Sequence, residues 1–411
     1  MMKYLLVACV ALWLPAQAQI SAINYNSSNS GLPYNTVYAI TTDNSGIVWC
    51  GTDGGLSKFN GSAWTTYTIA QGLPNNAIRS LFAAPNGILW IGTFFSGLVA
   101  FDGTTFTTYN TSNSGLPDNF VKSIAFEAPG TLWLGTGGGF AKLKNDTITG
   151  YNLTSLGMFS NNVATVAVRP NGNKILGFLN GGFAYYNDTT FTFYNHDNSN
   201  LPDNTVLSIA LDSLGNPYFA MPTGGIVAHF GGNVWQLYNT NLNPNQITNS
   251  FKCLANSPTG IWAGSFDRGL YHKVDFAFEN QTSWSNGTVM DTNITCIAVP
   301  QQAFQQQVFS AWVGTENGGV YKLDVATGIA ETPIDNSVLI SFTNNRSQML
   351  VAAKSNIQQV ALYTVDGRII AQMQNGYTNN TTLNLPQLSS GQIILRCVTE
   401  DGVAVKKLMV Y

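Results

Sequence analysis

Apolar and polar residues alternate in short stretches along most of this chain, and the stretches recur at a regular interval. The first complete unit reads VYAITTD, IVWCGT, GLSKFN and AWTTYT, with turn-forming residues between the stretches. Alternation with a period of two, in runs rich in β-branched and aromatic residues, predicts short β-strands joined by tight turns. The chain is therefore expected to consist of units of four strands.

One large side chain marks the second strand of every unit, usually in the context W-x-G-T. A glycine turn follows it, such as Gly54-Gly55 or Ser96-Gly97. The marker residues lie roughly 41 to 50 residues apart, which is the spacing of a four-stranded repeat. Seven repeats are predicted, with the markers Trp49, Trp90, Trp133, Ile175, Tyr218, Trp262 and Trp312.

Sheets of such short strands are marginally stable alone and must bury both faces against neighbours. Radial stacking of these sheets forms a β-propeller, which leaves only short protected edges. The marker tryptophans are expected to pack between neighbouring blades, because large aromatic side chains dominate core burial. The predicted fold class is all-β: a seven-bladed β-propeller over residues 19–328.

The seventh unit stops after its third strand, GGVYKLD. Upstream of the first unit, YNSSNSGLP at 25–33 closely matches YNTSNSGLP at 109–117, where YN ends a fourth strand. We therefore predict that ISAINYN at 20–26 is the missing outermost strand of the last blade and pairs with residues 318–324. This N-terminal strand would close the ring and remove its open radial face.

The repeat is absent from the remainder of the chain. Residues 329–338 are expected to form a linker. Residues 339–411 contain several alternating runs, with Asp366-Gly367 and Asp401-Gly402 between them. Because Asp-Gly supplies the positive φ that tight hairpin turns need, this segment is predicted to be a small C-terminal β-sandwich.

The first residues, MMKYLLVACVALWLPAQAQ, have a positive residue, an apolar run and small residues before Gln19. This layout predicts a signal peptide over residues 1–18. No later apolar run is long enough to suggest a transmembrane helix. Charged residues make up only 9% of the chain and the net charge is −3, so the sequence shows no basic patch for nucleic acid or for an anionic membrane.

The propeller repeat resembles the two-component-regulator propeller repeat, through GLPNNAIRSLFAAPNGILWIGT at 72–93 and its siblings. In that family the propeller commonly forms the extracytoplasmic sensor half of a membrane histidine kinase, so the resemblance implies a recognition module. The tail resembles the C-terminal sorting domain of type IX secretion cargo, through LYTVDGRII, NLPQLSSGQ and VKKLMVY. This resemblance implies contact with the outer-membrane secretion machinery and a location at the cell surface.

Residues with obvious catalytic potential are sparse. His196 is placed in a loop between blades, and His229 and His272 on third strands, so all three are interpreted as surface or rim residues without a catalytic or metal-binding role. Cys253 and Cys296 occupy matching places in adjacent inner strands. A cross-blade disulfide stays open if their Cα atoms lie within about 7 Å, but two buried thiols are the favoured expectation. The sequence predicts no catalytic residues, no metal site and no cofactor.

A ligand site is predicted where the blades depart from the repeat. In antiparallel blades, the turns between second and third strands emerge at the same end as the GLPxN loops, and we call this shared end the mouth. Aromatic, amide and charged side chains at a concave surface suit a polar, ring-bearing ligand. The candidates are Asp53, Phe94, Phe95, Phe266, Asp267, Arg268, Glu316 and Asn317 in the turns, with Arg79, Lys122 and Lys252 as second residues of inner strands.

The sequence therefore predicts a secreted, non-catalytic binding module that recognises an extracellular glycan or a protein ligand. Two alternatives remain open. The first is a propeller enzyme resembling streptogramin lyase, which would need a general base, and usually a metal, converging on the axis. The second is an adhesin or structural scaffold, in which the mouth residues bind nothing.

Overall fold

The computed structural model describes residues 20–410, apart from 159, 242–247, 259, 275–276, 281–289, 301–307, 327–337, 343–347, 365–368, 386–390 and 400–401. The predicted signal peptide therefore lies outside the described residues, as does nearly all of the predicted linker. The chain divides into two compact units, Met1–Gly328 and Ile329–Tyr411. No helix among the described residues has the length and apolar character needed to cross a membrane.

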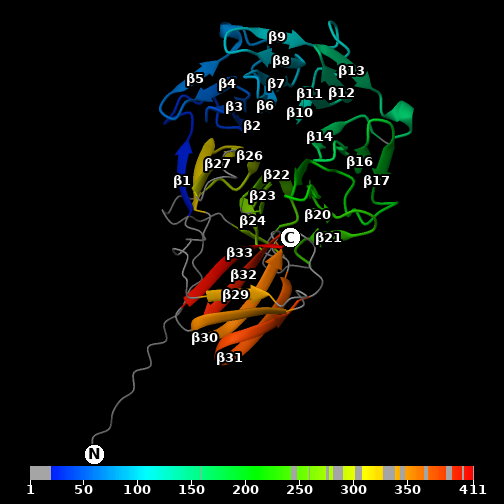
Figure 1. Ribbon diagram of the computed structural model, residues 1–411. Helices are drawn as coiled ribbons and strands as arrows, with labels where there is room; N and C mark the ends of the chain where they lie inside the picture. The colour runs from blue at the N-terminus through cyan, green and yellow to red at the C-terminus, as the bar shows by residue number, and fades with distance from the viewer. Residues whose placement is uncertain are drawn as a thin grey trace, which may run out of the picture. The chain divides into compact units, whose positions relative to one another are not determined.

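The described part of the first unit forms seven four-stranded antiparallel sheets, which are the blades of a β-propeller (Figure 1). The innermost strands are β2 (Val37–Thr42), β6 (Ile78–Ala83), β10 (Val121–Glu127), β14 (Val163–Val168), β18 (Ser208–Leu211), β22 (Phe251–Ser257) and β26 (Ile294–Ala298). The second strands are β3 (Val48–Thr52), β7 (Leu89–Thr93), β11 (Thr131–Thr136), β15 (Lys174–Phe178), β19 (Pro217–Met221), β23 (Gly260–Ser265) and β27 (Val308–Thr315).

The third strands are β4 (Leu56–Phe59), β8 (Leu98–Phe101), β12 (Gly139–Lys144), β16 (Phe183–Tyr186), β20 (Gly225–His229), β24 (Leu270–Val274) and β28 (Val320–Ala326). The outer strands are β5 (Trp64–Tyr67), β9 (Phe106–Tyr109), β13 (Thr147–Tyr151), β17 (Phe191–Tyr194), β21 (Trp235–Tyr238), β25 (Ala277–Asn280) and β1 (Ile20–Tyr25). The short 3₁₀ helices η1 (Ile69–Gln71) and η2 (Thr154–Leu156) lie in links between blades.

The ring is closed by the N-terminal strand. Strand β1 pairs antiparallel with β28, in a register that runs from Ile20 opposite Val325 to Tyr25 opposite Val320. The sheet order β1-β28-β27-β26 gives the last blade its fourth strand from the other end of the chain. In Figure 1, β1 accordingly lies beside the last blade rather than in the first. The predicted closure is confirmed.

The marker residues form the seams between blades. All five marker tryptophans are buried, and each clusters with apolar residues of the following blade. Trp133 of the third blade, for example, packs with Leu176 and Phe178 of the fourth. Ile175 and Tyr218 occupy the same position and are buried in the same way. The repeat of large side chains is therefore a repeat of blade-to-blade packing, as predicted.

A second set of contacts joins the inner strands around the axis. The side chain two residues after the start of an inner strand reaches the backbone of the next blade. Ser80 Oγ donates a hydrogen bond to the Val121 carbonyl oxygen at 3.0 Å, and Ser123 Oγ accepts one from the Val166 amide at the same distance. Small polar side chains fit here because the inner strands converge, which leaves little room beside the axis.

The second unit contains β29 (Val338–Phe342), β30 (Gln348–Thr364), β31 (Ile369–Asn384), β32 (Gly391–Thr399) and β33 (Gly402–Val410). The long strand β30 shifts register after Ala352; its first part pairs with β29 and its second part with β32. The five strands form one sheet, and residues of both parts of β30 share one core cluster. The Asp-Gly turns at 366–367 and 401–402 fall at least partly outside the described residues.

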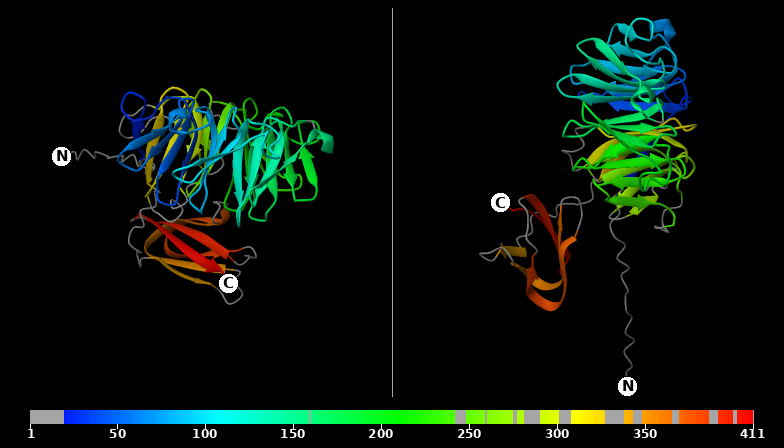
Figure 2. Two further views of the ribbon diagram at one scale, coloured as in Figure 1. Left: turned by 90° about the horizontal axis from the view of Figure 1, so that it is seen from above. Right: turned by 90° about the vertical axis from the view of Figure 1, so that its right-hand side faces the viewer.

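Figure 2 gives two further views, in which the propeller sheets stand side by side around the ring. In this antiparallel arrangement, every inner strand starts at the mouth and every second strand ends there. Residues from neighbouring blades are therefore brought together at one end of the propeller, although they lie about forty positions apart in the sequence.

Candidate functional site

The mouth is formed by the turns between second and third strands and by the GLPxN loops, which are joined by backbone hydrogen bonds. The Gly97 amide in a second-to-third-strand turn donates a hydrogen bond to the Asn119 carbonyl oxygen of the next GLPxN loop at 3.0 Å. The Gly319 amide makes the same contact to the Asn35 carbonyl oxygen at 3.1 Å, across the closure of the ring. Turns and loops thus share one end of the propeller, as the topology predicted.

Each turn is shaped by the residue that ends its second strand. Thr93 Oγ1 donates to the Gly97 carbonyl oxygen at 2.9 Å and accepts from the Ser96 amide at 2.9 Å. Gly97 has a φ of +83°, and a Cβ there would lie 2.2 Å from the Tyr109 carbonyl oxygen. Both the positive φ and the lack of space for a Cβ therefore require glycine at this position. The residue directly after the threonine is the one that faces the mouth.

An ion pair joins the first two blades at the mouth. Arg79 Nη2 lies 2.8 Å from Asp53 Oδ1, and the hydroxyl of Tyr38 donates to Asp53 Oδ2 at 3.1 Å. The Arg79 guanidinium also stacks over two rings, with its central carbon 4.0 Å from the Tyr38 centroid and 4.9 Å from that of Phe94. Burial, followed by the hydrogen bond to Asp53, raises the pKa of Tyr38. Arg79 is therefore held in place by contacts within the protein.

Three phenylalanines form an aromatic pocket between the second and third blades. The Phe94 ring centroid lies 4.3 Å from that of Phe95 and 4.3 Å from that of Phe120. Phe95 is 65% exposed, the largest fraction among the exposed large apolar residues of the described chain. The pocket is open, has a volume of about 480 Å³, and is lined by Phe94, Phe95, Thr111, Pro117, Asp118, Asn119 and Phe120.

Lys122 lies beside Phe120, one of the rings that line this pocket. Its Nζ lies 4.7 Å from the Phe120 ring centroid and donates a hydrogen bond to Asn162 Oδ1 of the next blade. Burial lowers the pKa of Lys122, and the charge of Asp118 acts in the opposite direction. The ammonium is therefore partly desolvated, and both of its close contacts are neutral groups.

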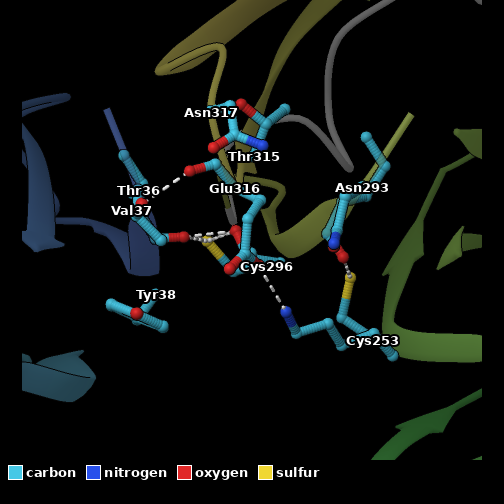
Figure 3. Close-up of polar contacts among 12 residues, drawn as sticks. Thr36, Val37, Tyr38, Cys253, Asn293, Cys296, Thr315, Glu316 and Asn317 are labelled. Atoms are coloured by element: carbon cyan, nitrogen blue, oxygen red, sulfur yellow. Dashed lines mark hydrogen bonds and ion pairs between the residues drawn. The ribbon is translucent and has the colours of Figure 1, made fainter. Parts of the chain in front are cut away.

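A separate cluster lies where the sixth, seventh and first blades meet (Figure 3). Lys252 Nζ lies 3.1 Å from Glu316 Oε2 and 5.3 Å from the Phe266 ring centroid. The Thr36 hydroxyl donates to the Glu316 backbone oxygen at 2.6 Å, as Figure 3 shows. This cluster repeats the combination of cation, carboxylate and aromatic ring found around Arg79.

The remaining candidates, Asp267, Arg268 and Asn317, lie outside the groups of residues around Arg79 and around Lys252. Asp267 accepts a hydrogen bond from the Thr248 hydroxyl at 3.2 Å and lies 3.6 Å from Arg268 Nε; both charged side chains are more than half exposed. The Asn317 amide donates to Asp291 Oδ2 at 2.8 Å. The structure thus places these three residues in the outer part of their turns, where their observed contacts shape the turn.

Sequence reasoning overlooked Tyr38 and Phe120. Tyr38 is the second residue of an inner strand, the position that Arg79 occupies in the next blade, but Tyr38 carries no charge and the charge pattern therefore does not mark it. Phe120 lies in the segment between a GLPxN loop and an inner strand, where the other blades have mostly small polar residues. The available signal was the departure of Phe120 from that pattern.

His196 lies in the loop between two blades as predicted, with its Nδ1 2.9 Å from the Leu201 carbonyl oxygen, and His272 is on the third strand β24. His229 is on a third strand as predicted, but it is buried rather than at the surface: its Nδ1 is 2.8 Å from the Tyr185 hydroxyl and its ring stacks on Trp235. Burial lowers its pKa. Within the described ranges, no group of three His, Cys, Asp or Glu residues is placed to hold a metal ion.

The two inner-strand cysteines are free thiols, of which Cys253 is buried and Cys296 half-buried. Cys296 Sγ lies 3.5 Å from the Val37 carbonyl oxygen in the first blade (Figure 3). Cys253 Sγ makes the equivalent contact to the Ile294 carbonyl oxygen at 3.9 Å. They thus take the place that serines occupy in other blades. Burial raises the pKa of the Cys296 thiol to about 12.

The closed ring of sheets and its mouth define the class of this protein as a β-propeller with a separate C-terminal domain. Residues 31–54 and 72–95 match the two component regulator propeller, and residues 332–411 match the secretion system C-terminal sorting domain. The chain therefore carries two-component-regulator propeller repeats and a type IX sorting domain, which implies secretion to the cell surface. No curated protein matches the chain.

Solved structures share the fold at low sequence identity. The extracellular domain of a hybrid two component system from B. thetaiotaomicron has 18% identity and a TM-score of 0.62, and the match covers 96% of this chain and 55% of that one. PorZ, a surface component of the type-IX secretion system of Porphyromonas gingivalis, has 16% identity and a TM-score of 0.58, with 95% and 60% covered. The chain thus spans little more than half of these two relatives.

A smaller relative matches the propeller over nearly its whole length. It is a catalytically inactive variant of virginiamycin B lyase from Staphylococcus aureus, solved with quinupristin. The identity is 13% and the TM-score 0.56, with 75% of this chain and 99% of that chain covered. At these identities the likenesses show the fold alone.

Proposed function

We propose that this protein is a cell-surface binding module whose mouth recognises an extracellular glycan or protein ligand through the pocket of Phe94, Phe95 and Phe120. The observation that carries the proposal is the exposed Phe95 ring, which packs edge-on against the Phe94 ring. Apolar rings packed within the blades are buried, so an exposed ring at a pocket is unusual in this molecule. An exposed apolar group at a concave surface favours a binding role.

The composition of the pocket suits a polar ligand that carries a ring. The phenylalanines offer apolar faces for stacking, while Asn119, Thr111 and Asp118 offer groups for hydrogen bonds. A volume of about 480 Å³ is within the range of small-molecule sites. Recognition by a few stacked and hydrogen-bonded groups needs no catalytic residue.

The relatives support an extracellular setting for this role. One match is the extracellular domain of a two component system, and PorZ is a bacterial surface component. A propeller exported by a sorting domain would meet ligands in the same surroundings. The proposal itself rests on the pocket, since the identities are low.

Binding of the exported chain, residues 19–411, to a glycan array and to surface-protein extracts tests the proposal. Phe95→Ala should lose at least about tenfold in affinity for the bound ligand, because aromatic anchors in pockets carry a large share of binding energy. Leu156→Ala is the matched control, since Leu156 is 56% exposed in η2 at the same end of the propeller. A scaffold would show no loss with either variant, and that outcome would refute the binding role of the pocket.

The sorting domain provides a separate test of export. Deleting residues 339–411 should leave the propeller in the periplasm instead of at the cell surface. Surface labelling and fractionation of the full chain and of the truncated chain measure this directly. Undiminished surface display of the truncated chain would contradict the role of the tail.

A further inference from the structure

The second residue of an inner strand is a cation in three blades, and the three cations differ in how they are neutralised. Arg79 pairs with Asp53 at 2.8 Å, and Lys252 pairs with Glu316 at 3.1 Å. In both cases the carboxylate belongs to the first turn residue of an adjacent blade. The third cation, Lys122, forms no ion pair within 4.0 Å among the described residues.

The turns around Lys122 explain the difference. The first turn residue of its own blade is Gly137, and those of the neighbouring blades are Phe94 and Leu179. None of these can supply a negative charge. Asp118 is the charge that acts on Lys122, but it forms no ion pair with it; its Oδ1 accepts the Phe120 amide at 2.6 Å in its own loop. The position that holds a counter-ion beside the other two cations is uncharged here.

Lys122 and the aromatic pocket share one side chain. Phe120 lines the pocket and also lies under the Lys122 ammonium, 4.7 Å from its Nζ. A ring resting on Phe94 and Phe95 would therefore carry its substituents toward a half-buried positive charge. Charge-assisted hydrogen bonds in partly desolvated sites are stronger than neutral ones.

We infer that the ligand of this pocket is an acidic saccharide, whose ring packs on Phe94 and Phe95 and whose carboxylate supplies the counter-ion that Lys122 lacks. This inference rests on the proposed function, because it concerns the same pocket. The pocket is sized for one or two sugar rings rather than for a protein interface. The Asn119 amide and the Thr111 hydroxyl suit the hydroxyl groups of such a ring.

The test is titration calorimetry of the exported chain with uronate oligosaccharides. Oligogalacturonate, oligoguluronate and glucuronate-containing oligomers are each compared with their own methyl esters, which keep the sugar rings and remove the charge. An acidic oligomer should bind roughly tenfold to hundredfold tighter than its ester, the range expected for one charge-assisted contact. Its affinity should fall as salt is raised, because the contact is between charges.

Three variants locate the effect. Lys122→Met should remove the preference for the acid over the ester and leave ester binding unchanged, and Lys122→Arg should restore part of the preference. Lys142→Met is the control, because Lys142 is on the third strand of the same blade, where its Nζ lies 4.9 Å from the Trp133 ring centroid and away from the pocket. Its preference should equal that of the unchanged protein. Circular dichroism confirms that each variant is folded.

The outcomes separate this inference from the proposed function. Equal affinity for acid and ester, an unchanged preference in Lys122→Met, or no binding of any uronate oligomer would each overturn the acidic ligand. Phe95-dependent binding of a neutral glycan or of a protein would then leave the binding module standing. Failure of Phe95→Ala to weaken any ligand would overturn both.

Discussion

The seams and the mouth of this propeller are built on the same backbone repeat, but their sequences behave in opposite ways. At the seams, every blade places a large residue at the marker position, and each one is buried against the next blade. At the mouth, the first turn residue changes in nearly every blade: Asp53, Phe94, Gly137, Leu179, Pro222, Phe266 and Glu316. The constant positions are those that every blade needs for packing, and the variable positions include those that we propose for binding.

The physical reason is the number of neighbours. A seam residue is surrounded by two sheets, so a smaller side chain leaves a cavity and a larger one cannot fit. A mouth residue has protein on one side only, so its side chain can change with little effect on folding. Substitutions should therefore separate into those that cost stability and those that cost binding.

The closing seam should show the largest effect on stability. Strand β1 contributes the whole pairing with β28, and its Tyr25 ring packs 5.2 Å from Phe59 and 6.0 Å from Trp312. Removing residues 20–25 should lower the free energy of unfolding by more than about 4 kcal/mol, the range of severe core damage. Urea unfolding of the truncated chain measures this loss.

A synthetic peptide of residues 19–26 gives the control for that experiment. Added in excess, it should restore part of the lost stability by filling the vacant edge. The same peptide with Ala22→Asp should fail, because Ala22 is buried in the core of the last blade. Equal stability with and without the strand would refute closure by β1.

The tryptophan seam should show the next largest effect. Trp133 is fully buried, and its Nε1 donates to Glu127 Oε2 at 2.7 Å. Trp133→Ala should lower the free energy of unfolding by about 3–5 kcal/mol. Phe95→Ala, at the mouth, should change it by no more than about 0.5 kcal/mol. Similar losses in the two variants would remove the distinction between seam and mouth.

The glycine turns allow a finer comparison. Gly87 and Gly97 have φ values of +87° and +83°, but a Cβ at Gly87 would meet nothing within 4 Å, whereas one at Gly97 would collide with the Tyr109 carbonyl oxygen. Gly87→Ala should cost about 1 kcal/mol from backbone strain alone. Gly97→Ala should cost clearly more, measured by thermal unfolding of both variants. An equal cost would mean that the turn relaxes freely.

The smallest effect concerns pH. Burial lowers the pKa of His229 in the folded chain below its ordinary 6.5, so the unfolded chain binds this proton more tightly. The stability linked to His229 should therefore be complete above about pH 6.5 and decrease as the pH falls toward the folded-state pKa. Thermal midpoints from pH 5 to 7.5 should slope less in His229→Gln. An unchanged slope would assign the pH dependence to other groups.

The sequence predicted the periodic parts of this structure well. The spacing of Trp49, Trp90 and Trp133 indicated the blades, and the early YN predicted the strand that closes the ring. Both patterns follow from backbone requirements that recur in every unit, so the sequence pattern of one blade predicts the structure of the next. The predicted pairing of 20–26 with 318–324 agrees with the observed register of Tyr25 opposite Val320.

The mouth was predictable only in outline, because it depends on which way each turn residue points. Asp53, Phe94, Phe266 and Glu316 each contact the second residue of an inner strand. The residues that follow them in the turn point elsewhere: Asp267 and Asn317 are engaged in their own turns and loops. No periodicity encodes that change of direction. Likewise, the sequence does not show that the candidates divide into one cluster around Arg79 and another around Lys252, because that depends on how the blades are arranged in the closed ring.

Hydrogen–deuterium exchange of the full exported chain, with and without its strongest array ligand, tests most directly whether binding occurs where the blades depart from the repeat. Added protection is expected at residues 93–97 and 117–123, around Phe95 and Lys122, with no change around Lys252 and Glu316. Protection confined to the sixth and seventh blades, or to the outer strands, would contradict this expectation.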